Sequence, residues 1–173
     1  MPKLKRGVRH PITFELNGRK VAGHAEPRML LTDFLRQELG ATDIHVGCEH
    51  GVCGACTIRL DGKLARACLT FAIQVDGRRL DTVDGLAERE GELSELQKAF
   101  RKHHALQCGY CTPGVLMSLS EYLERNPSPS EAEVRDLLSG HLCRCTGYVG
   151  MVRAVLDLAA RHVSGAGTGR NVE

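Results

Sequence analysis

The sequence predicts an α+β fold in two parts, with short strands and tight turns in the first half and helices in the second. Three observations support this prediction. Near the N-terminus, apolar and polar residues alternate, as in a strand with one buried face. From Leu93 onward, apolar residues recur at the three- and four-residue intervals of helices. Eight cysteines fall into two groups of four, one group in each half.

Two hairpins are expected in the first half. Residues 12–16 alternate apolar and polar side chains, Asn17-Gly18 favours a tight turn, and residues 20–25 form the returning strand. The second hairpin has residues 57–60 as its first strand and Asp61-Gly62 as its turn.

One helix is expected between the hairpins, over residues 32–39. Phe34 and Leu35 share an apolar face with Leu39, Thr32 is the expected N-terminal cap, and Gly40 ends the helix. Strands mixed with one helix and frequent glycines indicate a small α+β domain.

Four helices are expected in the second half. They contain residues 93–100, 113–123, 130–138 and 149–163. Pro113 suits the first turn of a helix, and Ser130 with Glu133 forms a capping-box pattern. We place the domain boundary within residues 83–92, which gives domains over 8–84 and 85–164 and a flexible tail over 165–173.

The first cysteine group has a spacing that indicates an iron–sulfur cluster. Cys48, Cys53 and Cys56 follow the C-x4-C-x2-C pattern of plant-type [2Fe-2S] ferredoxins, and Cys68 supplies the fourth thiolate. Four thiolates and two sulfides leave an oxidised cluster with a net charge of about −2, which needs many hydrogen-bond donors. Glycines allow a loop to turn its main-chain N–H groups toward the sulfurs.

The second cysteine group combines two short motifs. Cys108 and Cys111 form C-x2-C, whereas Cys143 and Cys145 form C-x-C. These segments can converge if both lie at helix N-termini, where the helix dipole stabilises an anionic cluster. By spacing alone a structural zinc site remains an alternative here. Surface or structural roles, rather than ligand roles, are expected for His45, His50, His103, His104 and His141.

Composition excludes several classes of protein. Apolar residues make up 42% of the 173 residues and charged residues 25%, as in soluble globular proteins. No apolar run is long enough to cross a membrane, and no secretory signal is expected at the start. The net charge of +2 gives no electrostatic case for nucleic acid as a partner. We therefore expect a cytoplasmic protein with reduced, metal-binding thiols.

The cysteine segments together resemble the small iron–sulfur subunit of the molybdenum hydroxylases, the family of xanthine oxidase, aldehyde oxidase and carbon monoxide dehydrogenase. The matching stretches are residues 47–57, 107–114 and 142–148, within a resemblance that covers residues 10–162. It implies an N-terminal plant-ferredoxin-like (β-grasp) [2Fe-2S] domain and a C-terminal four-helix-bundle [2Fe-2S] domain. It also favours a cluster over zinc at the second group.

The resemblance implies an electron-transfer subunit of a molybdenum-dependent hydroxylase or dehydrogenase. A large partner subunit would hold a molybdopterin dinucleotide of the cytosine type, a medium subunit would hold FAD, and the complex would be a dimer of heterotrimers. Electrons would pass from molybdenum through the helical-domain cluster and then the ferredoxin-like cluster to FAD. Gln107 matches a residue that contacts the pterin, and this chain would contribute no catalytic residue.

A free-standing two-cluster electron carrier or redox sensor is the alternative function. Mobile carriers are commonly acidic, because charge steers their encounters, whereas this chain is nearly neutral. The uncharged segments 109–110 and 147–150 suit a permanent interface. His141 departs from the family pattern, in which many relatives have asparagine. The substrate, whether an aldehyde, a purine, an N-heteroaromatic compound or carbon monoxide, depends on another chain, as does the final electron acceptor.

Overall fold

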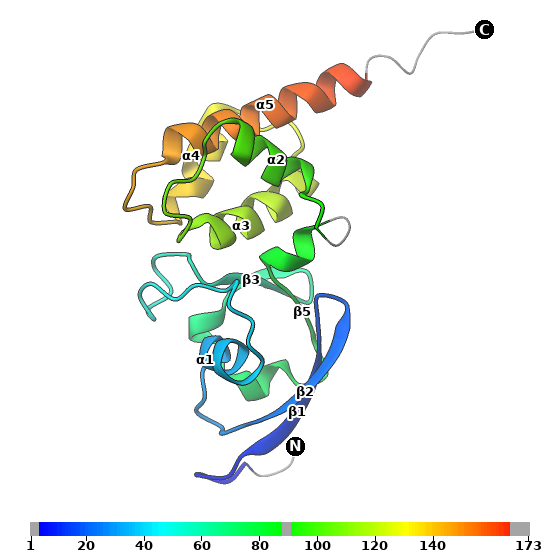
Figure 1. The fold of residues 1–173 in the computed structure, drawn as a ribbon, viewed down its shortest axis with the longest axis vertical. Helices are drawn as coiled ribbons and strands as arrows, with labels where there is room; N and C mark the ends of the chain where they lie inside the picture. The colour runs from blue at the N-terminus through cyan, green and yellow to red at the C-terminus, as the bar shows by residue number, and fades with distance from the viewer. Residues whose placement is uncertain (1–3, 88–90, 167–173) are drawn as a thin grey trace, which may run out of the picture.

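In the computed structural model, which describes residues 4–87 and 91–166, the two halves of the chain stack end to end (Figure 1). The first half contains a five-stranded sheet in the order β2-β1-β5-β3-β4. Its strands are β1 (His10–Leu16), β2 (Arg19–Ala25), β3 (Thr57–Leu60), β4 (Lys63–Arg66) and β5 (Arg79–Asp81). β5 is parallel to β1 and antiparallel to β3, so the last strand along the chain joins the two hairpins.

Both predicted hairpins are confirmed, with the turns where the sequence places them. Asn17 and Gly18 have φ values of 49° and 76°, and Asp61 and Gly62 have φ values of 49° and 78°. Two consecutive residues with positive φ make the kind of turn whose twist matches that of the flanking strands. The alternation in β1 is also confirmed, because Phe14 is buried and Glu15 is exposed.

The helix expected over residues 32–39 differs from the prediction in two respects. It begins as α1 (Leu31–Asp33) and continues as a π-helical turn, η1 (Phe34–Glu38), with Gly40 at φ 69° after it. The prediction that Thr32 caps this helix is wrong. Thr32 lies inside the first turn, fully buried, and its hydroxyl has no hydrogen-bond partner. The N-cap position belongs to Leu30, which makes no side-chain cap.

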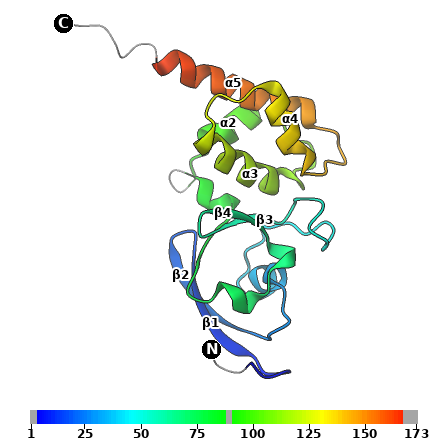
Figure 2. The same cartoon turned by 180° about the vertical axis from the view of Figure 1, so that it is seen from behind.

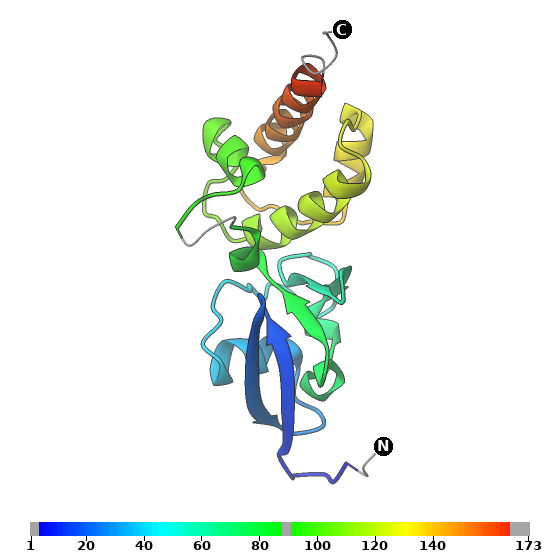
Figure 3. The ribbon, with the colours of Figure 1, turned by 90° about the vertical axis from the view of Figure 1, so that its right-hand side faces the viewer.

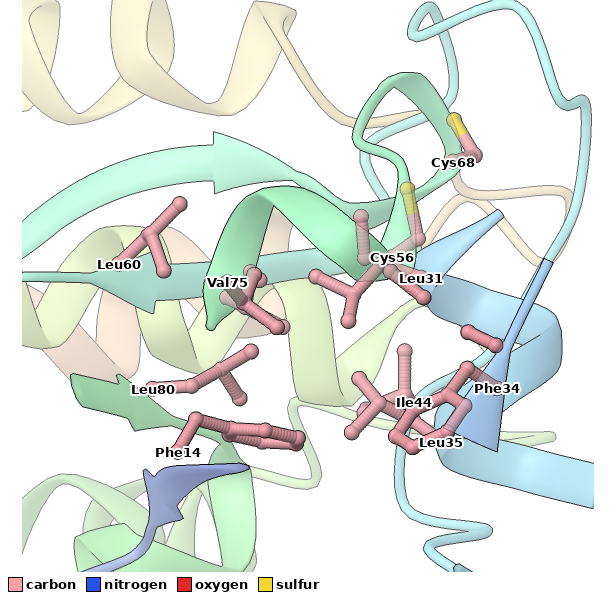
Figure 4. Packing of buried hydrophobic residues seen from close by; sticks show 14 of the residues in the cluster. Phe14, Leu31, Phe34, Leu35, Ile44, Cys56, Leu60, Cys68, Val75 and Leu80 are labelled. Atoms are coloured by element: carbon pink, nitrogen blue, oxygen red, sulfur yellow. The ribbon is translucent and has the colours of Figure 1, made fainter. Parts of the chain in front are cut away.

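The core of the first half lies between the sheet and the short helices (Figure 4). Phe14 from β1 packs against Phe34, with ring centroids 6.1 Å apart. Cys56 and Cys68 belong to the same buried cluster, at its edge. Three 3-10 turns complete this half: η2 (Ala67–Leu69), η3 (Ala72–Val75) and η4 (Val83–Leu86).

The second half contains the four expected helices. They are α2 (Glu95–Lys102), α3 (Thr112–Arg125), α4 (Glu131–Ser139) and α5 (Tyr148–Ala166). The predicted capping box at α4 is confirmed, since the Ser130 hydroxyl accepts the N–H of Glu133 at 3.3 Å and the Glu133 carboxylate accepts the N–H of Ser130 at 2.8 Å. Pro113 is the second residue of α3.

The second half has a core of its own. Phe100 from α2, Leu119 from α3, Val134 from α4 and Val155 from α5 are all buried in it. α5 extends two residues into the range expected to be a flexible tail, and residues 167–173 lie outside the described residues. The α+β class is thus confirmed. No helix within residues 4–87 and 91–166 has the length and apolar character needed to span a bilayer.

The two halves meet where α3 crosses β3 and β4 (Figure 2). Arg59 from β3 donates to the carboxylate of Glu124 at 2.7 Å and to the Ser120 hydroxyl at 3.0 Å, both on α3. Arg66 from β4 donates to the carbonyl of Gly140 at 3.0 Å and also bonds the Thr57 hydroxyl. Two arginines of the sheet therefore bond the helical half, which lies above the sheet in Figure 3.

Candidate metal centres

The first cysteine group lies on a loop that precedes β3 and on η2. Its most exposed member is Cys48, whereas Cys53, Cys56 and Cys68 are buried. Glu49, Gly51 and Gly54 all have positive φ, between 55° and 77°, so the loop repeatedly reverses its direction. This geometry turns main-chain N–H groups inward.

Main-chain donors stabilise a thiolate at Cys48. The N–H groups of Cys53 and His50 each point to the Cys48 sulfur at 3.4 Å. These bonds lower the pKa of Cys48 to about 6. Burial has the opposite effect on Cys68, whose pKa rises to about 11 from desolvation and from its bond to Cys56. The loop therefore stabilises negative charge at Cys48, its most exposed cysteine.

The second cysteine group lies at the N-terminal ends of two helices. Cys108 is exposed and Cys111 is buried just before α3, while Cys143 and Cys145 precede α5 and are half-buried. Burial, reinforced by a bond to Cys143, raises the pKa of Cys111 to about 12. The N–H of Gly147 points to the Cys143 sulfur at 3.2 Å. Thr146 has φ 53°, so α5 starts only after a left-handed residue.

Gln107 ties the two cysteine segments of the second group together. Its side-chain amide donates to the carbonyl of Cys145 at 3.0 Å. The side chain is exposed, and its carbonyl oxygen makes no hydrogen bond within residues 4–87 and 91–166, so this acceptor is available to a partner. Gln107 therefore has a role within this chain that the sequence did not reveal.

In both groups the four thiols are arranged as two neighbouring pairs. Cys53 lies close enough to Cys48 to affect its pKa, as Cys56 does for Cys68, Cys145 for Cys108 and Cys143 for Cys111. In the described part of the chain, no three histidine, cysteine, aspartate or glutamate side chains close around a single ion. A two-iron cluster needs two thiolates for each iron, four in all. The paired thiols and the main-chain donors therefore fit a [2Fe-2S] cluster in each group.

The two groups approach each other through main-chain contacts. The N–H of Leu142 donates to the carbonyl of Cys53 at 2.9 Å, so a ligand candidate of one group is bonded to the neighbour of Cys143 in the other. Gly114 at the start of α3 lies against Gly54 so closely that a Cβ on Gly114 would overlap the Gly54 carbonyl. Sequence patterns carry no signal for these contacts, because main-chain groups make them.

His141 is buried in this junction. It is only 2% exposed, and its Nε2 hydrogen-bonds the Ser118 hydroxyl at 2.8 Å. Burial, with a smaller contribution from the Arg66 charge, lowers the pKa of His141 to about 4, so the ring is neutral at pH 7. This agrees with the structural role expected for His141 rather than a ligand role.

Comparison with known proteins identifies both halves of the chain. A 2Fe-2S iron-sulfur cluster binding domain matches residues 14–87, and a [2Fe-2S] binding domain matches residues 82–156. The nicotine 6-hydroxylase small subunit of Paenarthrobacter nicotinovorans is 56% identical over 84% of this chain and 87% of its own length. The caffeine dehydrogenase subunit gamma of Pseudomonas sp. (strain CBB1) is 50% identical over 87% of this chain and 91% of its own.

Solved structures agree with these relatives. Quinoline 2-oxidoreductase from Pseudomonas putida 86 matches with a TM-score of 0.86 and 45% identity, over 93% of this chain and 99% of that chain. Such relatives are subunits of oxidoreductase complexes, which favours a permanent subunit over a free-standing carrier. The chain belongs to the family of small iron–sulfur subunits of the molybdenum hydroxylases, and it is an electron-transfer subunit of a multi-subunit oxidoreductase with two [2Fe-2S] clusters.

Proposed function

We propose that the two cysteine groups are the two cluster sites and that electrons pass from the second to the first. In this proposal residues 8–84 form a plant-ferredoxin-like β-grasp domain, and residues 85–164 form a four-helix-bundle domain. The ligands of the first site are Cys48, Cys53, Cys56 and Cys68. The ligands of the second site are Cys108, Cys111, Cys143 and Cys145.

The observation that carries this proposal is the hydrogen bond from Leu142 to Cys53. Tunnelling weakens steeply with distance, and it weakens more across empty space than along bonds. The Leu142 N–H and the Cys53 carbonyl lie 2.9 Å apart, and Leu142 is covalently joined to Cys143. A route from the second site to the first therefore needs only one hydrogen bond, with no gap through space.

The chain's own residues would hold the clusters and control their charge. When bound, each cluster supplies one-electron redox chemistry. Around Cys48, the N–H groups of His50 and Cys53 stabilise negative charge on sulfur. Around Cys143, the N–H of Gly147 does the same. Such hydrogen bonds favour the more negative, reduced state and so raise the reduction potential.

We further propose that partner subunits supply the remaining cofactors. A large subunit would hold molybdenum on a molybdopterin cytosine dinucleotide, a medium subunit would hold FAD, and the assembly would be a cytoplasmic dimer of heterotrimers. Exposed apolar side chains near both sites support such interfaces, since they would be covered on assembly. Val52 and Leu69 lie by the first site, and Leu142 and Val149 by the second.

We also propose an N-heteroaromatic substrate for the complex. Nicotine, caffeine and quinoline in the names of the relatives are all nitrogen heterocycles. The test is substrate-dependent bleaching of the clusters in the purified complex, with a simple aliphatic aldehyde as the comparison substrate. Bleaching by the aldehyde and by no heterocycle would refute this substrate class.

Metal analysis tests the cluster proposal directly. We expect about four irons and about four acid-labile sulfides per chain, because each four-thiolate site holds two of each. Visible absorption should be broad and should bleach on reduction with dithionite. The measurement is iron and sulfide content together with zinc content on the same sample. Stoichiometric zinc in a colourless, folded protein would contradict the proposal.

Gln107 is proposed to position the second site toward the pterin of the large subunit. Gln107→Ala in the assembled complex should keep its full iron content but slow the reduction of the clusters by substrate. The physical reason is the loss of the bond to Cys145, worth about 1–3 kcal/mol when the partner is left unsatisfied. Stopped-flow absorbance measures the effect.

A second variant separates the two roles of the amide. Gln107→Glu keeps an acceptor directed outward but replaces the donor to the Cys145 carbonyl with a carboxylate oxygen. If it behaves like Gln107→Ala, the bond to Cys145 is what matters. If it behaves like the unmodified complex, the outward acceptor matters. Wild-type kinetics in both fully loaded variants would show that Gln107 has no role in the transfer.

A further inference from the structure

Tyr110 and His45 each hydrogen-bond the main chain of the opposite half across the junction. The Tyr110 hydroxyl donates to the carbonyl of Val46 at 2.7 Å. In return, Nδ1 of His45 lies 2.8 Å from the carbonyl of Tyr110, which makes the imidazole N–H the donor. The two rings are stacked, with centroids 4.7 Å apart and planes inclined by 22°.

We propose that this pair, the Tyr110–His45 clasp, sets the spacing and orientation of the two cluster sites. Both members are positioning residues, since they would act through the ligand loops. The inference rests on the proposed function, because it takes the cysteine groups as the cluster sites. It goes beyond that function by naming side chains that tune the coupling between the clusters.

The clasp acts at the ligand loops themselves. Tyr110 lies between Cys108 and Cys111, so its carbonyl belongs to the second ligand loop. Val46 lies two residues before Cys48, so its carbonyl belongs to the first. A Cβ added to Gly47 would lie 3.7 Å from the Tyr110 ring and 3.1 Å from the Cys53 sulfur. The ring therefore lies close to the first ligand loop at Gly47.

Burial does not explain why Tyr110 takes this position. Tyr110 remains 48% exposed, so apolar burial alone does not fix its orientation. Tyr110 donates one hydrogen bond through its hydroxyl, accepts another through its main-chain carbonyl, and stacks on the His45 ring. Together these define an orientation between two loops, which nonspecific apolar packing would not.

The clasp complements separate contacts across the same junction. These contacts are the bond from Leu142 to Cys53, the bond from Arg66 to Gly140, and the bonds from Arg59 to Glu124 and Ser120. Those contacts hold the two halves together, but none of them involves the residues between Cys108 and Cys111. Loss of the clasp should therefore leave both domains folded and in contact, while the loops that carry Cys48 and Cys108 become free to shift relative to each other.

The experiment compares three variants in the full complex loaded with both clusters. Tyr110→Ala removes the clasp, Tyr110→Phe removes only the bond to Val46, and Tyr122→Phe is the control. The Tyr122 hydroxyl bonds Asn126 within the second half and does not cross the junction. The readout is the spin–spin splitting of the EPR signals when both clusters are reduced. This splitting depends on the inverse cube of the distance between the spins.

We expect Tyr110→Ala to narrow or broaden the splitting while each cluster, reduced alone, keeps its own signal. Tyr110→Phe should shift the splitting less, and Tyr122→Phe should leave it unchanged. Amide hydrogen exchange at residues 45–48 should speed up in Tyr110→Ala as well. Unchanged splitting and unchanged exchange in Tyr110→Ala would overturn the clasp. Missing iron or missing EPR signals in the unmodified complex would instead overturn the cluster assignment.

Discussion

Replacing Gly114 with alanine is expected to destabilise the protein by about 3 kcal/mol, because the added methyl group collides with a main chain that cannot rotate away. The Cβ would overlap the carbonyl of Gly54 and would lie 3.1 Å from the Cα of Ala55. Helix propensity alone predicts the opposite, a gain of up to about 1 kcal/mol for alanine over glycine in a helix. A lower free energy of unfolding in Gly114→Ala would show that the contact between the two halves outweighs helix propensity. A higher one would show the reverse.

Thermal unfolding of the cluster-loaded protein measures this effect. A second helical glycine provides the control, since a Cβ on Gly150 in α5 would lie 3.1 Å from the Cα of Ala105, within the second half. Gly150→Ala should lower stability without disturbing the junction. Gly114→Ala should in addition separate the unfolding of the two halves into two transitions. A single transition at or above the wild-type temperature would show that the close approach of α3 to Gly54 is not required.

Replacing one ligand in each site should remove the two redox centres independently. Cys68→Ser should change or abolish the EPR signal of the first site and leave the other nearly intact. Cys145→Ser should do the reverse. The reason is that each site draws all its proposed thiolates from its own half of the chain, and the thiol pairs do not cross the junction.

EPR of dithionite-reduced variants, with iron content measured on the same samples, provides the test. We expect about two irons to be lost from each variant, since a [2Fe-2S] site needs four thiolates. The two variants serve as controls for each other. Loss of both signals from folded Cys68→Ser protein would contradict independent sites.

Local signals explain why much of the fold could be predicted. Turn residues with positive φ determined both hairpins, and a capping serine determined the start of α4. The start of α2 carries an equally local signal, because Ser94 and Gln97 also form a capping box. Such features depend on residues close in sequence, so no tertiary information is needed to find them.

The missed elements depend on tertiary contacts. β5 has only three residues, and Arg79 and Asp81 are charged, so its strand conformation is imposed by β1 on one side and β3 on the other. The first helix continues as a π-turn, and Thr32 is buried there instead of capping. Spacing identified the cysteine groups, but the bonds that connect the groups involve main-chain carbonyls. Every residue has a main-chain carbonyl, so such bonds cannot be recognised from residue type.

The position of β5 determines when, during synthesis of the chain, the five-stranded sheet can form. A lone two-stranded hairpin is only marginally stable. The hairpins β1–β2 and β3–β4 have no direct ladder with each other and are joined through β5, the last strand to leave the ribosome. The sheet can therefore close only after residue 81 has emerged, when Cys48 to Cys68 have already been synthesised. Until then the loop that carries the first cysteine group has no completed sheet to pack against.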